Sequence, residues 1–371
     1  MKQVCLICER TAPQHTLFCQ DARCPAERAP LLLERGDHLD DLEIIAPVAT
    51  LRTSMLYQAS RGQQRLLLKV AHPDPRAAAR LKREADFLAA VSGSASDPVL
   101  PTLLPPYLGT DTHKRSYGST MVGGQLLYFA LYALFEGEPL RAILARNPQP
   151  WVNHAGWIAH SLAKAVALMH SRGILHMALS PDSALVRFDH VTGTPEVLLY
   201  DLGLAANATE AIDGRPAWQL QWYREAVAPS YVAPELLDLE RTQVAVGYRT
   251  DVYGVGLVLY EMLIGRPAFP APRIDDQTTY DLVRAGSLPS MSRVLDAKDL
   301  AAVANRAISK QRYEHLQAFD KELLAATGPV PDTRRPFWYG LERPLLALVV
   351  LLAVAFLVTL TLDILNITLL S

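Results

Sequence analysis

Four cysteines are the residues of this sequence best suited to hold a metal. Cys5 and Cys8 form a C-x2-C pair, Cys19 and Cys24 follow as a C-x4-C pair, and the remaining chain has no cysteine. Four thiolates in two pairs can surround a tetrahedral Zn²⁺ and stabilise a segment that is too short to bury a core of its own. Because four sulfurs close the coordination shell, we expect a structural zinc site without an open position for a substrate.

The spacing of these cysteines resembles a zinc ribbon over residues 1–30, although the second knuckle is two residues longer than the usual C-x2-C. The alternatives are a redox pair, four unconnected reduced thiols, or His15 as a substitute ligand. A disulfide framework is typical of small secreted domains, whereas this chain has 371 residues and its first ten lack the long apolar stretch of a signal peptide.

Apolar periodicity predicts the elements that position the middle of the chain, from about residue 40 to 328. The run 66–71, LLLKVA, predicts a buried strand, and LLYFALYALF at 126–135 predicts another. The stretch 151–173 predicts a long helix that ends at Gly173, and mostly helical patterns follow residue 250. Strands and helices therefore alternate, which indicates a mixed α and β domain.

The run 76–91 also predicts a helix, because its apolar residues recur at helical spacing. Its apolar face is expected to contain Leu81, Ala85, Leu88 and Ala89.

Seven short motifs along these elements resemble the protein kinase family, and they fall in the family's order over most of residues 40–326. They are Lys69 in LLLKVA, Glu84 in KREADFL, the hinge-like ALFEGEPL, His176, DLG at 201–203, APE at 233–235, and TDVYGVGLVLYEML at 250–263. The resemblance implies an α+β fold of two lobes, with a Ser/Thr kinase-like domain at 40–328.

The same resemblance implies roles for three polar side chains. Lys69 would hold the α- and β-phosphates of ATP, Glu84 would pair with Lys69, and Asp201 would bind Mg²⁺. The alternative is a structural ion pair and a solvated aspartate in a turn. The resemblance further implies two structural contacts, Asp251 with the backbone near His176, and Arg312 with Glu235.

The catalytic loop departs from the family's H-R-D-L-x-x-x-x-N pattern. Ala178 replaces the aspartate that accepts the substrate's proton, and a methyl group can neither accept a proton nor orient a hydroxyl. Ser183 replaces the asparagine that binds the second Mg²⁺, and Ser180 replaces a lysine that often steadies the transferred phosphate. Asp182 and Asp189 are the candidate substitute bases, but neither position is expected to face the substrate.

The loop that covers the phosphates in the family has lost its glycines. Ala49, Leu51 and Ser54 take the three glycine positions, and no glycine lies between Gly36 and Gly62. Glycine lets backbone N–H groups approach phosphates closely, so we expect Leu51 and Ser54 to hinder that approach.

The C-terminal stretch predicts a membrane anchor. A Pro/Arg-rich linker at 329–343 precedes an uncharged apolar run at 344–362, close to the roughly 20 residues that cross a bilayer. A transmembrane helix at 344–363 is therefore expected. Arg334, Arg335 and Arg343 precede it and no basic residue follows, so the large N-terminal part would be cytoplasmic in a single-pass membrane protein.

These features predict a membrane-anchored pseudokinase that serves as a signalling scaffold or a nucleotide-responsive binding module for an unidentified protein partner. One alternative is a weak or atypical Ser/Thr kinase that transfers phosphate from ATP, and another is a zinc-ribbon adaptor with the kinase-like domain as a spacer. The expected cofactors are zinc and, if nucleotide binds at all, ATP with Mg²⁺. The net charge of −2 does not favour nucleic acid as a partner.

Overall fold

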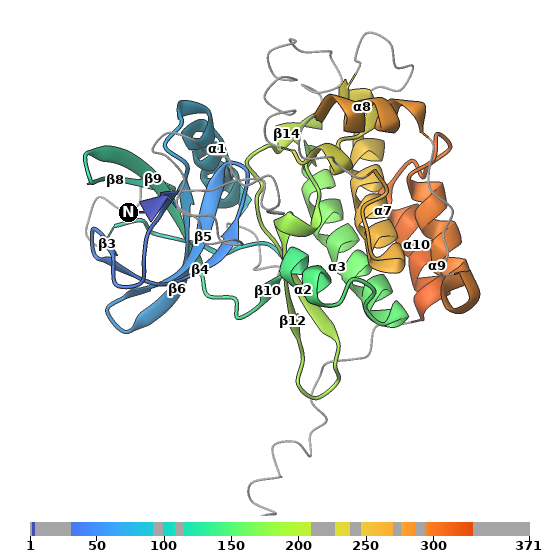
Figure 1. Ribbon diagram of the computed structural model, residues 1–371, viewed down its shortest axis with the longest axis horizontal. Helices are drawn as coiled ribbons and strands as arrows, with labels where there is room; N and C mark the ends of the chain where they lie inside the picture. The colour runs from blue at the N-terminus through green and yellow to red at the C-terminus, as the bar shows by residue number, and fades with distance from the viewer. Residues whose placement is uncertain are drawn as a thin grey trace, which may run out of the picture. The chain divides into compact units, whose positions relative to one another are not determined.

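An antiparallel sheet and a bundle of helices make up the part of the chain that the computed structural model describes (Figure 1). The described residues are 2–3, 31–91, 99–107, 115–208, 227–237, 246–269, 276–286 and 294–328. The cysteine segment, the linker 329–343 and the apolar run 344–362 lie outside them.

The sheet has seven strands in the order β3-β4-β5-β6-β9-β7, with β8 also paired to β9. Its strands are β3 (His38–Leu39), β4 (Leu42–Thr50), β5 (Ser54–Arg61), β6 (Gln64–Ala71), β7 (Leu103–Leu104), β8 (Gly118–Val122) and β9 (Gln125–Ala133). The register pairs Lys69 of β6 with Leu56 of β5 and Ala130 of β9, so Lys69 sits in the middle of the sheet.

Both faces of this sheet are apolar, which explains the continuous hydrophobic run around Lys69. Leu66, Leu68 and Val70 belong to one buried cluster, while Leu67 and Ala71 belong to another. Alternate side chains of a strand point to opposite faces. Lys69 therefore shares its face with Leu67 and Ala71.

Helix α1 (Pro75–Val91) follows β6 directly and confirms the helix expected from apolar spacing. Leu81, Ala85 and Leu88 are buried as expected, but Ala89 is exposed, so that part of the prediction is wrong. The buried stripe includes Glu84 instead, which is 0% exposed. A charged residue can be buried at this position because its carboxylate is paired with Lys69. The spacing of apolar residues cannot predict a buried charge.

The remaining described helices lie together to the right of the sheet in Figure 1. They are α2 (Leu140–Arg146), α3 (Val152–His170), α6 (Pro234–Leu237), α7 (Tyr248–Ile264), α8 (Asp276–Ala285), α9 (Val294–Ala307) and α10 (Leu316–Thr327). The long helix expected at 151–173 is α3, and the turn after it contains Gly173 at φ +69°. Glycine suits this left-handed position because it has no Cβ to clash with the backbone.

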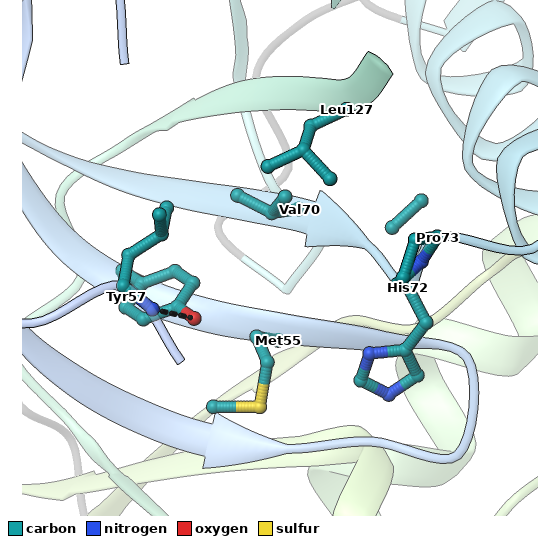
Figure 2. A pocket seen from close by; sticks show the side chains of 8 residues that line it. Met55, Tyr57, Val70, His72, Pro73 and Leu127 are labelled. Atoms are coloured by element: carbon teal, nitrogen blue, oxygen red, sulfur yellow. Dashed lines mark hydrogen bonds between the residues drawn. The ribbon is translucent and has the colours of Figure 1, made fainter. Parts of the chain in front are cut away.

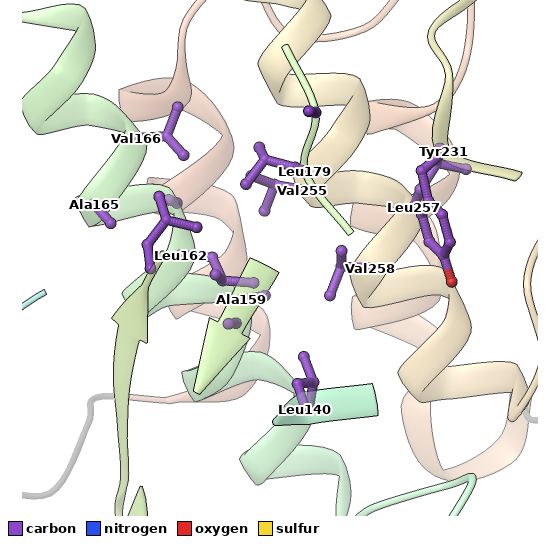
Figure 3. Packing of buried hydrophobic residues seen from close by; sticks show 14 of the residues in the cluster. Leu140, Ala159, Leu162, Ala165, Val166, Leu179, Tyr231, Val255, Leu257 and Val258 are labelled. Carbon is purple, nitrogen blue, oxygen red and sulfur yellow. The ribbon is translucent and has the colours of Figure 1, made fainter. Parts of the chain in front are cut away.

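Helix α7 is the core of the helical part (Figure 3). All its residues from Thr250 to Leu263 are buried, so its sequence is apolar on every side rather than on one stripe. Leu179 of the catalytic loop packs against Gly254, where an added Cβ would lie 2.9 Å from the Leu179 Cβ. The loop therefore rests directly on the most buried helix.

Short strands place the catalytic loop beside the DLG segment. The loop lies between β11 (Ile174–Leu175) and β12 (Ala184–Phe188), and DLG lies between β13 (Pro195–Leu199) and β14 (Ala206–Asn207). Strand β11 pairs with β14, and β12 pairs with β13 in a hairpin. The two segments are thus aligned at both ends, and β10 (Glu138–Pro139) adds a third strand beside β12.

The predicted mixed α and β class is confirmed. The predicted localisation as a single-pass membrane protein is contradicted by the structure. No helix within the described ranges is both long enough and apolar enough to span a bilayer. The run 344–362 that motivated the prediction lies outside those ranges. The domain boundaries at 40 and 328 stay predictions.

Candidate functional site

Three predicted site residues come together in one buried cluster. Lys69 Nζ lies 2.5 Å from Glu84 Oε2 and 2.8 Å from Asp201 Oδ1. The side chains of Lys69 and Glu84 are 2% and 0% exposed, whereas that of Asp201 is 25% exposed. The cluster thus joins β6, helix α1 and the DLG segment, and only its aspartate faces solvent to a sizeable extent.

Tyr132 is a fourth member of this cluster that the sequence motifs did not identify. Its hydroxyl donates a hydrogen bond of 2.8 Å to Glu84 Oε1, so both oxygens of the carboxylate are engaged. Tyr132 lies on the same face of β9 as Ala130, which pairs with Lys69 across the sheet. Strand alternation from Lys69 could therefore have placed Tyr132 near Glu84, but it could not have shown the hydrogen bond.

The charges in this cluster set its protonation. Burial alone would lower the pKa of Lys69, but the negative charges of Asp201 and Glu84 outweigh burial and raise it. For Asp201, burial would raise the pKa, but the neighbouring Lys69 ammonium outweighs burial and lowers it. At neutral pH the pair is therefore ammonium and carboxylate, which are the charge states suited to a phosphate and a divalent cation.

Asp251 fixes the start of the catalytic loop. It accepts hydrogen bonds from the backbone N of His176 at 2.8 Å and of Met177 at 2.6 Å, and a third contact of 2.8 Å joins it to His170 Nε2. Met177 has φ +67°, a left-handed conformation that is unfavourable for a side chain of this size. The hydrogen bonds from Asp251 help to hold the backbone in this conformation.

His176 is buried beneath the loop as a neutral ring. The backbone N–H of Ala178 donates to His176 Nδ1 at 3.2 Å, so Nδ1 carries no proton. Burial is the main reason that the pKa of His176 lies below its usual value. His176 therefore shapes the turn and is not exposed to a reactant, being 0% accessible.

The side chains at the substituted positions of the catalytic loop, Ala178, Ser180 and Ser183, are all buried. Ala178 is 7% exposed and presents only a methyl group. The Ser183 hydroxyl donates to the Ser180 carbonyl at 2.7 Å and accepts from the Ser180 N–H at 3.2 Å. Ser180 is the N-cap of the short helical turn Pro181–Ser183, and Ser183 completes the capping box, so its oxygen is bonded to the backbone of Ser180.

Asp182 lies in the same turn, and its carboxylate is paired with the guanidinium of Arg141. Arg141 Nη2 donates to Asp182 Oδ2 at 3.1 Å, and Arg141 Nη1 donates to Glu261 Oε1 at 2.8 Å. The hydroxyl of Tyr231 accepts a further bond from Arg141 at 2.9 Å. No sequence signal identified Arg141, because its partners lie 41 to 120 residues away.

Asp189, the other candidate base, closes the β12–β13 turn. Its Oδ1 accepts hydrogen bonds from the backbone N of Val191 at 2.9 Å and of Thr192 at 2.8 Å. An aspartate that bonds its own turn in this way is acting as a turn residue.

The three substituted glycine positions lie at the turn between β4 and β5: Ala49 is near the end of β4 and Ser54 is the first residue of β5. Strand β4 ends at Thr50 and β5 begins at Ser54, so Leu51 lies in the connecting turn. Leu51 is 2% exposed and Ser54 is 1% exposed, which means that both side chains are packed inside the protein. Ala49 is partly buried against the larger apolar cluster.

Glu235 and Arg312 meet at the base of the helical part, as the sequence analysis expected. Arg312 Nη1 and Nη2 donate to the two Glu235 oxygens at 3.0 and 3.2 Å. Thr250 at the start of α7 adds a hydrogen bond of 2.8 Å to Glu235 Oε1. These contacts join helix α6 to α7 and to the turn before α10.

Asp201 is the carboxylate best placed to contribute to a metal site. Within the part of the chain that the structure describes, no three His, Cys, Asp or Glu side chains are grouped so as to hold a metal ion by themselves. The four cysteines lie outside this part. A Mg²⁺ ion at Asp201 would therefore need a bound nucleotide to supply further oxygen ligands.

Comparison with known proteins decides the family. The protein kinase domain family matches residues 122–324, which are 203 of the 371 residues. The chain belongs to the protein kinase domain family. Lys69, Glu84 and the phosphate loop precede the matched range, so their relation to the family rests on the geometry described above.

Several curated proteins that are similar to this chain are named serine/threonine-protein kinases. Serine/threonine-protein kinase GL21140 of Drosophila persimilis is 33% identical over 125 residues, and CG17528 of Drosophila melanogaster is 31% identical over 134 residues. These alignments cover 34% and 36% of this chain but only 15% and 16% of the relatives. Human serine/threonine-protein kinase DCLK3 is 26% identical over 216 residues, which are 56% of this chain and 31% of DCLK3.

Proposed function

We propose that this chain is a pseudokinase, a kinase domain that binds and presents a protein partner and transfers little or no phosphate. The observation that carries the proposal is Ala178, a methyl group at the position where the family has its catalytic base. Its backbone N–H is bonded to His176, so the loop has a well-defined conformation at this point. What is lost is therefore the reactive group rather than the loop.

The nearby carboxylates support the proposal because each is already engaged. Asp182 is held by Arg141, and Asp201 is paired with Lys69. Glu261 contacts both Arg141 and Tyr231. A general base must reach the proton that it abstracts within about 3 Å, so a substitute would first have to leave its partner.

The second candidate function is a weakly active or atypical Ser/Thr protein kinase. The Lys69, Glu84 and Asp201 cluster favours it, because these side chains have the charges and contacts suited to ATP and Mg²⁺. Phosphoryl transfer depends largely on positioning and electrostatics, so loss of a base lowers the rate without abolishing it in principle. The Ser/Thr kinase relatives also favour this reading.

A phosphotransfer assay separates the two functions. The full-length chain is incubated with ATP, Mg²⁺ or Mn²⁺ and a generic protein substrate, beside the variants Lys69→Met and Asp201→Asn. We expect turnover far below the roughly 1–100 s⁻¹ of ordinary kinases, with no difference between wild type and either variant. Lys164→Met, which changes an exposed lysine of α3, is the matched control.

An active enzyme would give the opposite pattern. Wild-type turnover within the ordinary range, lost in Lys69→Met and Asp201→Asn but kept in Lys164→Met, would reject the pseudokinase proposal. Autophosphorylation of wild type that is absent from Lys69→Met and Asp201→Asn would also reject the pseudokinase proposal.

We further propose that Cys5, Cys8, Cys19 and Cys24 hold one structural Zn²⁺. The donor set supports this, because two pairs of thiolates suit tetrahedral zinc. The flanking chain also supports it, since β1 (Lys2–Gln3) pairs antiparallel with β2 (Leu31–Leu32). The segment that contains the cysteines therefore starts and ends at neighbouring strands, as a compact metal-stabilised unit requires.

A further inference from the structure

One face of the sheet carries a buried apolar cluster to which no described helix contributes a residue. The cluster's members belong to strands β3 to β6 and β9, apart from Leu33. Met55 of β5 and Val70 of β6 are 1% and 5% exposed. A sheet face is buried against a second layer of structure. Among the described apolar residues that form or contact this cluster, only Leu33 and Tyr107 lie outside the strands, so they supply little of such a layer.

A pocket on the same face is lined mainly by side chains of this cluster. Met55, Val70 and Leu127 line it, and Figure 2 shows Pro73 at one end and Tyr57 at the other. Pro73 is exposed, so that end of the pocket lies at the protein surface. The pocket is therefore apolar inside and borders solvent at one end.

Leu33 ties the N-terminal part of the chain to this pocket. Its side chain lines the pocket and is 3% exposed, and its backbone N–H donates to the Tyr57 hydroxyl at 3.2 Å. Leu33 directly follows β2, and β2 pairs with β1 in the register Lys2 with Leu32 and Gln3 with Leu31. Residues 4–30, which lie outside the described residues, thus leave and rejoin the described chain next to Leu33.

The sequence of residues 4–30 contains large apolar side chains that could cover this face. They are Leu6, Ile7, Leu17 and Phe18. Chains below about 40 residues rarely bury a sufficient core without a disulfide, a metal or a partner surface. Because residues 4–30 are fewer than this, their apolar side chains need a surface outside the segment.

Two other segments next to the sheet in the sequence also lie outside the described residues, but they are less suited to cover it. Residues 92–98, SGSASDP, follow α1, and residues 108–114, LGTDTHK, precede β8. Leu108 is the one large apolar residue in these two stretches. Composition therefore favours residues 4–30 as the occupant of the apolar face.

We propose that residues 4–30 pack on the apolar face formed by Met55, Val70 and Leu127, so that this face is a docking surface for the chain's own N-terminal segment. Leu33 is the anchor from which the segment reaches the face. Val70 follows Lys69 directly on β6, so the docked segment stabilises the strand that positions Lys69. The inference goes beyond the proposed function, because it depends neither on phosphate transfer nor on a metal at the cysteines.

Photo-cross-linking of the full-length chain tests this contact. A p-benzoylphenylalanine takes the place of Pro73 at the surface end of the pocket, and peptide mass spectrometry identifies what it captures after irradiation. We expect cross-links to peptides from residues 4–30 of the same chain. The matched control has the same photoreactive residue in place of Val191, which is 45% exposed and lies in the β12–β13 turn. It should capture no peptide from residues 4–30.

Hydrogen exchange gives a second measurement, with the substitutions placed in the segment rather than in the sheet. Leu17→Ser combined with Phe18→Ser removes two apolar side chains, so the amides of β5 and β6 should exchange about tenfold faster, while those of α10 are unchanged. Gln14→Ser combined with Gln20→Ser is the matched control, because it changes two polar side chains of the same segment. It should leave the exchange of β5 and β6 unchanged.

Each of three results would overturn the proposal. The first is the absence of cross-links from position 73 to residues 4–30, including capture of residues 108–114 in their place. The second is a cross-link from position 73 to a second copy of the chain, which would make the face an interface between copies. The third is unchanged exchange of β5 and β6 in the Leu17→Ser, Phe18→Ser variant. None of these results decides whether the chain transfers phosphate or binds zinc, so those proposals keep their own tests.

Discussion

Arg312 and Glu235 form a buried, two-bonded ion pair between segments 77 residues apart. Their side chains are 4% and 1% exposed, and the guanidinium of Arg312 also lies 4.7 Å from the centre of the Tyr253 ring. A guanidinium matches a carboxylate with two parallel hydrogen bonds, so the contact fixes direction as well as distance. The pair therefore fixes helix α6 relative to the turn before α10.

Glu235→Gln should lower the free energy of unfolding by about 3–5 kcal/mol, because it leaves the Arg312 charge buried without its partner. Urea denaturation of the full-length chain gives the measurement. Glu196→Gln is the control, since Glu196 pairs with Arg187 where both side chains are about 40% exposed, and it should cost only about 0–1 kcal/mol. A loss in Glu235→Gln no larger than in this control would contradict the assigned role.

The buried His176 predicts an acid-sensitive stability. Because burial lowers its pKa below the ordinary value of 6.5, the unfolded chain takes up a proton near pH 6.5 while the folded chain does not. The stabilisation is therefore complete above pH 6.5 and is lost as the pH falls through the folded-state pKa. We expect the free energy of unfolding to fall by up to about 1.4 kcal/mol per pH unit from this residue.

Comparison with His176→Gln isolates the contribution of His176. The variant should be less stable at pH 7.5, and its stability should decline less steeply than that of wild type between pH 6.5 and 5. The lowered pKa of His154 contributes to both proteins and cancels in the difference. Parallel pH profiles would show that His176 does not titrate as proposed.

The elements that carry the site were predictable because local patterns determine them. The apolar run around Lys69 predicted a buried strand, which is β6, and the spacing in 76–91 predicted α1. The resemblance carried by the order of short motifs then predicted that Lys69, Glu84 and Asp201 belong together, and the structure places Lys69 Nζ within 2.8 Å of both carboxylates.

The contacts that determine what the site can do were not predictable in the same way. Arg141 binds Asp182 and Glu261 through the folded chain, and no periodicity relates these positions. His72 resembles any polar residue after a strand until its ring is seen to bind the Leu51 carbonyl. Likewise, Ala89 follows the apolar spacing of α1 yet is exposed, while the charged Glu84 is buried. The spacing of apolar residues predicts which face of a helix or strand is buried, whereas the partners of polar side chains depend on the tertiary fold.

The cysteine segment should bind one zinc per chain. Elemental analysis of protein purified without chelator tests this, together with the double variant Cys5→Ser with Cys8→Ser, which removes one thiolate pair. Two thiolates cannot close a tetrahedral site, so the variant should lose the metal. Wild-type zinc near zero, or zinc that is retained in the double variant, would contradict the proposed site.

Restoring the missing base alone should not produce an efficient kinase. In Ala178→Asp the new carboxylate would stand on a loop whose backbone is already held by Asp251, but Ser183 would still be bonded to Ser180 and would be a poor metal ligand. Groups that act together in catalysis are strongly non-additive, so repair of one part regains little. Ala178→Asp combined with Ser183→Asn should therefore recover more turnover than the sum of the two single variants.

The phosphate loop should still limit this double variant. Adding Leu51→Gly should lower KM for ATP and so raise kcat/KM for ATP further, whereas adding His160→Phe should not. Steady-state kinetics with a generic protein substrate give the comparison, and a cooperative thermal unfolding transition above the assay temperature verifies that each variant is folded. If Ala178→Asp alone reached the roughly 1–100 s⁻¹ of ordinary kinases, neither Ser183 nor Leu51 would limit turnover, and this prediction would be wrong.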